Sequence, residues 1–446
     1  MARLFGTDGV RGLANTELTC ETAFRLGQAA AVFLGKTIIV GRDTRLSGDM
    51  LEAALAAGIM SMGGSAHLAG IIPTPGVAFL TKALHCDGGV VISASHNPPE
   101  YNGIKFFDSR GVKLPDAVED RVQAFVVGGG AQPQDLPAGD KVGVAIPVEN
   151  GRSLYIDNVV RSVESQGVRF DGLRVALDAA HGAASVTSEE ALSRLGAQVT
   201  VINNDFTGID INVGCGSTDL APLHALMDST GADVGIAHDG DADRVIVIGA
   251  HGKEIDGDII EAVCALDLKE RGLLRGDRVV TTVMCNLGFT RAMQEAGIEV
   301  FQTKVGDRYV LEAMLEKDCA LGGEQSGHII MADYNSTGDG LLVACQFLAA
   351  CKRLGKTVEE AASVMTSFPQ VLVNVRDVDK AALPANQAVA AAVAAASDEL
   401  GDTGRVLIRP SGTEPLVRVM VEALDIDQAS RVAEHLAEVV KAELAL

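Results

Sequence analysis

The sequence predicts an α/β protein with three related α/β domains that contain mixed sheets, followed by an α+β domain at the carboxyl end. Three observations carry this prediction. The chain has 446 residues, too many for a single hydrophobic core. A strand–helix–strand unit recurs three times, and the pattern changes after residue 367. One long doubly wound sheet is the alternative, and the length of the chain disfavours it.

The repeated unit consists of a strand, a polar loop, a helix, a glycine and a second strand. Its copies cover residues 37–68, 174–202 and 278–302. A glycine in the left-handed conformation commonly ends a helix, and Gly63, Gly196 and Gly297 stand at that point of the three copies. Because strand–helix–strand is the usual crossover between parallel strands, each copy predicts one α/β domain.

Composition marks the domain boundaries. Residues 128–140 form a connector rich in glycine and proline, and a softer boundary falls at 249–252. The carboxyl end combines three expected strands and two expected helices without a crossover, which is typical of an antiparallel α+β domain. The strands are expected at 371–375, 406–409 and 417–422, and the helices at 386–400 and 428–446. We therefore expect domains at residues 1–145, 146–250, 251–367 and 368–446.

Charge and composition exclude several classes of function. The formal net charge of −22 disfavours nucleic acid and anionic membranes as partners. The longest apolar stretches, 341–345 and 388–396, fall well below the roughly 20 residues of a membrane span. The amino terminus has no apolar signal core, and the eight cysteines have no zinc-like spacing. We expect a reduced, cytoplasmic protein, in which an anionic ligand requires local basic groups.

Ser95 is the first candidate for chemistry. It lies in Ser-Ala-Ser-His-Asn-Pro, residues 93–98, directly after an apolar segment at 88–92 that is typical of a buried strand. Pro98 and Pro99 stiffen the loop that follows. A serine presented in this way can carry a covalent group between substrates. Taken alone, the motif fits an ordinary polar turn equally well.

Three aspartates form the second candidate, after an expected strand at 234–237. They stand at positions i, i+2 and i+4: Asp239, Asp241 and Asp243. An EF-hand is excluded because the sixth and twelfth positions of the loop hold Arg244 and Ala250. The alternative is a solvated acidic turn, but three carboxylates within five residues repel one another, and a turn gains nothing that offsets this repulsion. Three carboxylates leave room for water and a phosphate oxygen, so the triplet predicts a site for one Mg²⁺ ion.

The segment from Arg409 to Pro415 has the parts of a phosphate-binding loop. Gly412 lets backbone amides approach an anion, and the hydroxyls of Ser411 and Thr413 add donors. Arg409 and Arg418 offer forked guanidinium donors. A hairpin turn closed by prolines is the alternative, but two arginines in an acidic protein favour phosphate binding.

A polar loop at residues 322–328, Gly-Gly-Glu-Gln-Ser-Gly-His, precedes an apolar segment. Glu324 and Ser326 alternate and could face one hydroxylated ligand, although this signal is weak alone. Further basic residues stand near glycines: Arg11, Lys105, Lys304 and Arg308. The segment 41–45, Gly-Arg-Asp-Thr-Arg, is interpreted as a salt-bridged turn.

Five motifs make the whole chain similar to the α-D-phosphohexomutase family. They are Phe-Gly-Thr-Asp-Gly-Val-Arg-Gly at 5–12, Ser-Ala-Ser-His-Asn-Pro at 93–98, Asn-Gly-Ile-Lys-Phe-Phe at 102–107, Asp-Gly-Asp-Ala-Asp-Arg at 239–244 and Gly-Glu-Gln-Ser-Gly-His at 323–328. The resemblance implies four domains around a central cleft, with one motif-bearing wall from each. Gln325 and the first motif point to the branch that acts on glucosamine phosphates.

The resemblance also implies roles for individual residues. Ser95 is expected to be a phosphoserine, with Mg²⁺ between its phosphate and the three aspartates. The remaining catalytic set is Arg11, Lys105, Arg244 and His328, of which Lys105 and His328 are the candidates for acid or base. The expected substrate-binding set is Lys304, Arg308, Glu324, Ser326, Arg409, Ser411, Gly412, Thr413 and Arg418. His96 is expected to be a bystander.

The implied reaction interconverts glucosamine 6-phosphate and glucosamine 1-phosphate through a bisphosphate, and it feeds the synthesis of UDP-N-acetylglucosamine and cell-wall precursors. A sugar bisphosphate or autophosphorylation would prime Ser95. The expected partner is a small phosphosugar, and the chain is expected to be a monomer or homodimer. Two alternatives stay open: a phosphomannomutase or phosphoglucomutase with the same residues, and a sugar-phosphate sensor without catalysis.

Overall fold

The computed structural model describes residues 4–6, 8–411 and 416–446. The chain divides into two compact units. The first contains the residues up to Met284 together with Gly297–Val364, and the second contains Cys285–Ala296 and Met365–Leu446.

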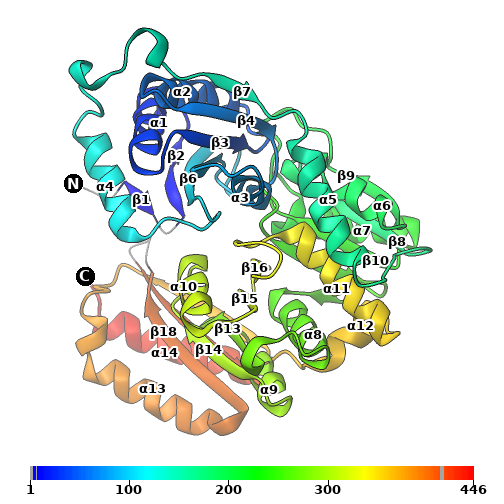
Figure 1. Ribbon diagram of the computed structural model, residues 1–446. Helices are drawn as coiled ribbons and strands as arrows, with labels where there is room; N and C mark the ends of the chain where they lie inside the picture. The colour runs from blue at the N-terminus through cyan, green and yellow to red at the C-terminus, as the bar shows by residue number, and fades with distance from the viewer. Residues whose placement is uncertain (1–3, 7, 412–415) are drawn as a thin grey trace. The chain divides into compact units, whose positions relative to one another are not determined.

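The first sheet of the larger unit has seven strands in the order β1-β2-β6-β5-β3-β4-β7 (Figure 1). β3 pairs in parallel with β4 and β5, whereas β6 is antiparallel to β5 and β2, so the sheet is mixed. The strands are β1 (Phe5–Gly6), β2 (Gly9–Leu13), β3 (Thr37–Arg42), β4 (Ser65–Ile71), β5 (Gly88–Ile92), β6 (Tyr101–Asp108) and β7 (Ala145–Pro147).

Helices cover both faces of this sheet. They are α1 (Cys20–Phe33), α2 (Gly48–Ser61), α3 (Thr74–Ala83) and α4 (Asp116–Val127). Ile38 and Val40 of β3 face the core shared with α1 and α2, because alternate side chains of a strand point to one face. α1 and α2 approach closely where glycines meet: a Cβ on Gly27 would lie 2.1 Å from the carbonyl oxygen of Leu55.

The second sheet has five strands in the order β12-β11-β10-β8-β9. The strands are β8 (Arg174–Asp178), β9 (Gln198–Ile202), β10 (Val234–His238), β11 (Val245–Gly249) and β12 (Glu254–Ile255). The accompanying helices are α5 (Gly151–Glu164), α6 (Ser188–Arg194) and α7 (Ala221–Thr230). β10 and β11 are antiparallel neighbours, so the loop between them turns back on one edge of the sheet.

The third sheet has four strands in the order β14-β13-β15-β16. The strands are β13 (Arg278–Thr282), β14 (Glu299–Thr303), β15 (Leu321–Gly323) and β16 (Ile329–Met331). The neighbouring helices of the same unit are α8 (Gly257–Glu270), α10 (Asp307–Lys317), α11 (Gly340–Leu354) and α12 (Val358–Ala361). The chain between β13 and β14 passes through α9 (Leu287–Glu295), which groups with the second unit.

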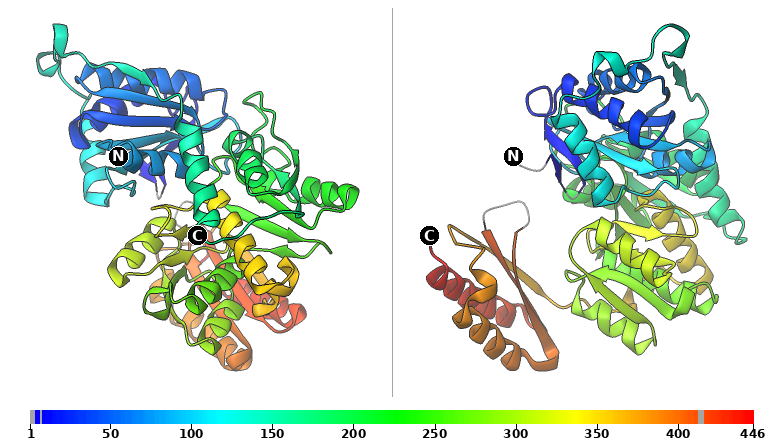
Figure 2. Two further views of the ribbon diagram at one scale, coloured as in Figure 1. Left: turned by 45° about the vertical axis from the view of Figure 1, so that its right-hand side comes forward. Right: turned by 60° about the vertical axis from the view of Figure 1, so that its left-hand side comes forward.

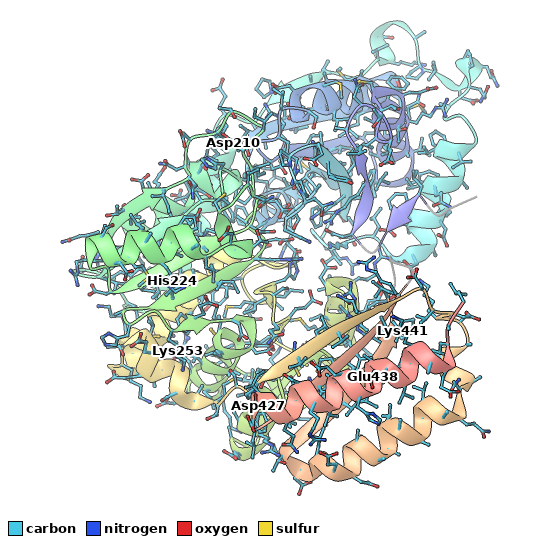
Figure 3. The ribbon with its side chains drawn as sticks, turned by 180° about the vertical axis from the view of Figure 1, so that it is seen from behind. Asp210, His224, Lys253, Asp427, Glu438 and Lys441 are labelled. Carbon is cyan, nitrogen blue, oxygen red and sulfur yellow. The ribbon has the colours of Figure 1, made fainter. Side chains whose placement is uncertain are left out.

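The second unit contains a three-stranded antiparallel sheet in the order β17-β19-β18. Its elements after α9 are β17 (Gln370–Arg376), α13 (Gln387–Leu400), β18 (Gly404–Pro410), β19 (Leu416–Ala423) and α14 (Ile426–Glu443). α13 and α14 pack against the sheet around one hydrophobic core (Figure 2). Asp427 in the first turn of α14 and Lys441 in the last (Figure 3) complement the helix dipole.

The predicted fold class is confirmed. In each of the three predicted copies the two strands pair in parallel. The glycines Gly63, Gly196 and Gly297 have φ values of 74°, 101° and 67°, in the left-handed region. The described residues form four separate sheets rather than one long sheet. No helix among the described residues has the length and apolar character needed to cross a membrane.

Candidate active site

Ser95 occupies a tight loop between β5 and β6. Its φ of 52° is in the left-handed region, which is unusual for a residue other than glycine and marks strain held by the surrounding structure. The Ser95 amide donates to the Ser93 hydroxyl at 2.9 Å. The Ser95 side chain is buried, and its Oγ lies 2.7 Å from Asp239 Oδ2. The backbone therefore aims the serine hydroxyl at the aspartate loop.

Arg45 holds this serine loop in place. Its guanidinium donates to the carbonyl oxygens of Ser95 at 2.9 Å, Asn97 at 2.8 Å and Tyr101 at 2.9 Å, and also to that of Pro98. Asp43 accepts from Arg45 Nε at 2.9 Å. The segment 41–45 was predicted to be a salt-bridged turn. The ion pair is present, but it serves to orient a fully buried arginine toward four carbonyls of another loop.

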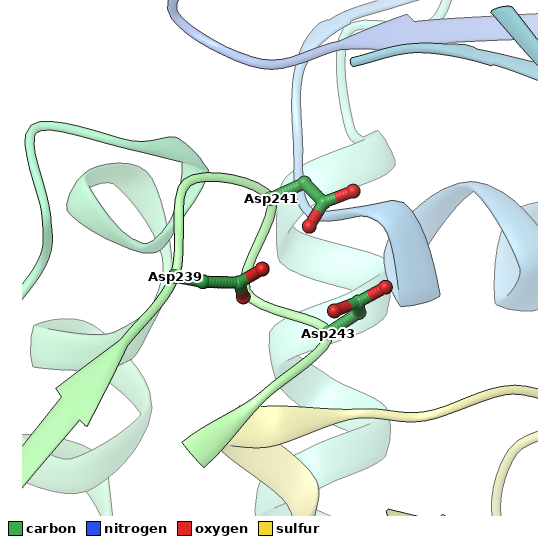
Figure 4. Close-up of side chains that lie close together, drawn as sticks. All are labelled: Asp239, Asp241 and Asp243. Carbon is green, nitrogen blue, oxygen red and sulfur yellow. The ribbon is translucent and has the colours of Figure 1, made fainter. Parts of the chain in front are cut away.

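The three aspartates lie on the loop between β10 and β11 and gather on one side of it (Figure 4). Each offers an oxygen within 4.8 Å of the others, and all three side chains are buried. Among the described residues, Asp241 Oδ1 and Asp243 Oδ1 have no hydrogen-bond partner. Burial, with Asp243 and Asp241, raises the pKa of Asp239 well above its ordinary value. Buried carboxylate oxygens that repel one another fit a hard divalent cation.

Contacts with α3 and β6 fix the aspartate loop in place. Asp241 Oδ2 accepts from Thr74 Oγ1 at 2.7 Å and from Lys105 Nζ at 3.0 Å. The two loops approach so closely that position 240 requires glycine, because a Cβ there would lie 2.7 Å from the carbonyl oxygen of Ser95. The serine loop and the aspartate loop are thus packed against each other through backbone atoms.

Lys105 is a buried cation between the two loops and the amino-terminal segment. Its Nζ lies 2.9 Å from Asp8 Oδ2, and Asp8 also pairs with Arg11. Burial opposes the charge of Lys105, yet Asp241 and Asp8 raise its pKa. Asp8 also contacts Lys113, and these cations hold the pKa of Asp8 well below its usual range despite burial. Lys105 therefore carries a positive charge beside the aspartates.

His328 directly precedes β16 and extends the charged network to the third sheet. Its Nδ1 lies 3.4 Å from Asp243 Oδ2 and its Nε2 lies 3.7 Å from Asp307 Oδ2. Burial disfavours the imidazolium, but Asp243 and Asp307 raise the pKa of His328 to about 9. The Arg244 amide donates to Asp239 Oδ1 at 3.2 Å, and its side chain lies 3.8 Å from Asp243 Oδ1. Both residues surround the aspartates with positive charge.

The predicted sugar loop joins β15 to β16. Glu324 Oε1 accepts from the Gly306 amide at 3.0 Å, and burial raises the pKa of the Glu324 carboxyl. Gln325 Nε2 donates to Asp256 at 3.2 Å, which ties the loop to the start of α8. Ser326 and Lys304 are exposed. The arrangement leaves the polar tip of this loop accessible to a ligand.

Arg308 has a different environment from the one expected of a substrate-binding residue. It is buried, and its guanidinium pairs with Asp116 and with Glu119 of α4, at 2.5 Å from Glu119 Oε1. Its predicted contact with substrate stays a prediction.

The phosphate-binding motif belongs to the second unit. Arg409 and Arg418 are direct cross-strand neighbours on β18 and β19, and like charges in that position repel. Burial and Arg418 lower the pKa of Arg409. An anion bound between the two guanidiniums would therefore reduce their repulsion. Ser411 is buried, and its carbonyl accepts from Lys380 Nζ at 2.9 Å. Gly412 and Thr413 lie outside the described residues.

His96, a predicted bystander, lies close to the serine. Its Nδ1 is 3.1 Å from Ser95 Oγ. Burial, with Arg244 and Arg11, lowers the pKa of His96 to about 4, so the ring is neutral at physiological pH. Adjacent side chains on a regular strand diverge, but the left-handed backbone at Ser95 breaks that rule. The sequence motif is compatible with a turn but does not indicate a left-handed residue at Ser95.

Comparison with known proteins defines the class of this fold and site. Four domain families of phosphoglucomutase/phosphomannomutase match the chain: domain I over residues 2–129, domain II over 153–252, domain III over 256–368 and the C-terminal domain over 372–439. The chain belongs to the phosphoglucomutase/phosphomannomutase family.

Within that family the chain is similar to phosphoglucosamine mutases. It is 52% identical to that of Streptomyces coelicolor, with each chain fully covered, and 48% identical to that of Clostridium novyi, with 99% of each covered. The fold resembles a phosphoglucomutase/phosphomannomutase family protein of Burkholderia thailandensis, with a TM-score of 0.83, 23% identity and coverage of 99% of this chain and 97% of that one.

Proposed function

We propose that this protein catalyses the interconversion of glucosamine 6-phosphate and glucosamine 1-phosphate. The observation that carries the proposal is the 2.7 Å contact between Ser95 Oγ and Asp239, at the edge of three buried carboxylates. A hydroxyl beside a cation-binding triplet is suited to phosphoryl transfer, which depends on positioning and charge neutralisation. The similarity to phosphoglucosamine mutases over the full chain supports the choice of sugar.

The reaction uses Ser95 as a phosphoryl carrier. In the first transfer the bond between phosphorus and Ser95 Oγ breaks, a bond to the sugar O1 forms, the O1 proton passes to a base, and Ser95 Oγ takes up a proton. The resulting bisphosphate then reorients in the site. Its 6-phosphoryl group is transferred to Ser95 Oγ, and O6 takes up a proton. His96 Nδ1 lies 3.1 Å from Ser95 Oγ, and its neutral ring can accept the serine proton in this step.

Neighbouring charges suit the remaining roles. Asp239, Asp241 and Asp243 would hold one Mg²⁺ ion, which supplies charge neutralisation at the transferring phosphoryl group when bound. Lys105 carries a positive charge, since its pKa is raised, and serves as a fixed cation rather than a base. His328, with a pKa of about 9, holds a proton at neutral pH and is suited to donate it.

Sugar and phosphate contacts complete the proposal. Glu324 and Ser326 bind sugar hydroxyls, and Lys304 is an exposed cation near them in sequence. Arg409, Ser411, Gly412, Thr413 and Arg418 hold the phosphate that is not reacting. Because two repelling guanidiniums lie opposite each other on β18 and β19, a dianionic phosphate is the ligand that this pair favours.

A rate comparison on three substrates tests the function. The purified enzyme, with Mg²⁺ and a hexose 1,6-bisphosphate as primer, is assayed on the 6-phosphates of glucosamine, glucose and mannose. A kcat/KM highest for glucosamine 6-phosphate supports the proposal. A higher value for glucose or mannose 6-phosphate would instead make the protein a phosphoglucomutase or phosphomannomutase. Absence of turnover on all three, with phosphosugar binding retained, would indicate a sensor.

A further inference from the structure

Two ion-paired residues join the first and third domains beside the active site. Lys113, which follows β6, contacts Asp307 in the first turn of α10. Arg308, the next residue of α10, pairs with Asp116 and Glu119 in the first turn of α4. Lys113 and Arg308 are each only 9% exposed in their side chains. We call these two sets of ion pairs the α10 clasp.

Lys113 connects residues on both sides of the aspartate loop. In the first domain its Nζ also contacts Asp8, which pairs with Lys105 and Arg11. In the third domain Asp307 lies 3.7 Å from His328 Nε2. The clasp therefore belongs to a network in which positive and negative side chains alternate, and this network extends from the amino-terminal segment to His328 of the third domain.

The start of α10 also holds the sugar loop. Gly306 precedes the helix, and its amide donates to Glu324 Oε1 at 3.0 Å. Gly306, Asp307 and Arg308 are consecutive residues. This short segment therefore holds Glu324 through a backbone hydrogen bond. Its two side chains, Asp307 and Arg308, form ion pairs with the first domain. A movement of α10 away from the first domain would move the partner of Glu324 with it.

We propose that Lys113 and Arg308 are positioning residues whose clasp sets the location of Glu324 relative to Ser95, and thereby the affinity for the sugar. The inference rests on the proposed function, in which Glu324 binds sugar hydroxyls and Ser95 carries the phosphoryl group. It assigns Arg308 to the domain junction rather than to substrate.

An ordinary structural role would give a different pattern. Ion pairs that only stabilise the fold lower the unfolding temperature and leave substrate affinity alone. Ion pairs between two domains fix the orientation of one domain relative to the other. The guanidinium of Arg308 adds geometric specificity because its planar, forked donors pair with two carboxylates. Loss of the clasp should therefore raise KM while the chemistry at Ser95 continues, since the serine loop and the aspartate loop keep their own contacts.

The test compares Lys113→Met and Arg308→Met with Arg275→Met. Arg275 is a matched control because its partners, Asp318 and Asp333, lie in its own domain. In the full-length, Ser95-phosphorylated enzyme we expect KM for glucosamine 6-phosphate to rise about tenfold in both clasp variants, with kcat changed less than about threefold. Arg275→Met should leave both values near wild type.

Two further measurements separate positioning from folding. Hydrogen–deuterium exchange of the amides at 306–310 should accelerate in the clasp variants without substrate, because the contacts that hold this segment are lost. A charge exchange that combines Arg308→Glu with Glu119→Arg and Asp116→Asn should recover most of the wild-type KM. Opposite charges would again face each other across the same junction, and the Asp116 carboxylate, which also contacts residue 308, would no longer repel the new glutamate. If Arg308→Met does not fold, Arg308→Lys is used in its place.

The outcomes discriminate clearly. Unchanged KM in folded clasp variants, no recovery on charge exchange, or equal effects of Arg275→Met would overturn the clasp. If wild-type protein fails to turn over any of the three hexose 6-phosphates, the proposed function fails instead. In that case unchanged amide exchange at 306–310 would count separately against the clasp.

Discussion

Ser95 Oγ lies 2.7 Å from Asp239 Oδ2, although the two residues are 144 positions apart in the sequence. The serine comes from a loop of the first domain and the aspartate from a loop of the second. The approach of the loops is so close that Gly240 has no room for a Cβ beside the Ser95 carbonyl. The Ser95 hydroxyl and the three carboxylates are therefore held together as one cluster.

Replacing the nucleophile should abolish turnover without abolishing binding. Ser95→Ala removes the atom that carries the phosphoryl group, so mutase activity should be undetectable. Glucosamine 6-phosphate should still bind, as measured by calorimetry. Mass spectrometry should find phosphate on Ser95 of the wild-type protein and not on the variant. Full activity of Ser95→Ala would exclude the covalent mechanism.

The cation requirement should depend on Asp241. Asp241→Asn keeps the shape of the side chain but removes the charge, so the half-saturating Mg²⁺ concentration should rise by about 10- to 100-fold, the range seen even for groups that only support a ligand. Activity titrated against Mg²⁺ measures this. Asp228, an aspartate of α7 outside the cluster, provides a control as Asp228→Asn. An unchanged Mg²⁺ titration in Asp241→Asn would remove this residue from the metal site.

Arg45 should be needed for the chemical step, although all its contacts with the serine loop are to backbone carbonyls. Lysine cannot reproduce the forked contacts of its guanidinium with the loop carbonyls. A displacement of the nucleophile by about 1 Å costs about 100-fold in rate, so Arg45→Lys should lower kcat by roughly that factor. Arg42→Lys is the control, because Arg42 pairs with Asp49 and Glu52 instead. A kcat equal to wild type in Arg45→Lys would contradict this role.

Glu261 should make the stability of the protein dependent on pH. It is completely buried beneath Gly323, both of its carboxyl oxygens lack hydrogen-bond partners among the described residues, and burial with Asp258 raises its pKa well above 4.5. A raised pKa in the folded state favours folding below pH 4.5, and that contribution is lost as the pH rises toward the folded pKa.

Glu261→Gln mimics the neutral acid at every pH. The variant should therefore unfold at a higher temperature than wild type at about pH 8, and the difference should shrink toward about pH 4.5, where both chains carry a neutral group. Thermal unfolding followed by circular dichroism at several pH values measures the difference. A difference that does not vary with pH would show that Glu261 is ionised in the folded protein.

Local patterns determined much of this protein. The three strand–helix–strand copies, the antiparallel carboxyl-terminal domain, the serine loop and the aspartate triplet all depend on neighbours within a few residues to a few tens of residues. Periodicity, prolines and helix-ending glycines encode such features directly. Three carboxylates within five residues converge by chain geometry alone, which is why a cluster that could hold a cation was predictable.

Only the tertiary structure decided which distant residues support these loops. Arg45 contacts the Tyr101 carbonyl 56 positions away, Thr74 bonds Asp241, and Lys113 reaches Asp307. Such pairings follow from how the sheets pack, and no local pattern distinguishes a buried arginine that orients a loop from one in a surface turn. The left-handed backbone that brings His96 to Ser95 is likewise imposed by the packed loops. The sequence determined the reactive groups, and long-range packing decided their geometry, because burial makes each displaced charge costly.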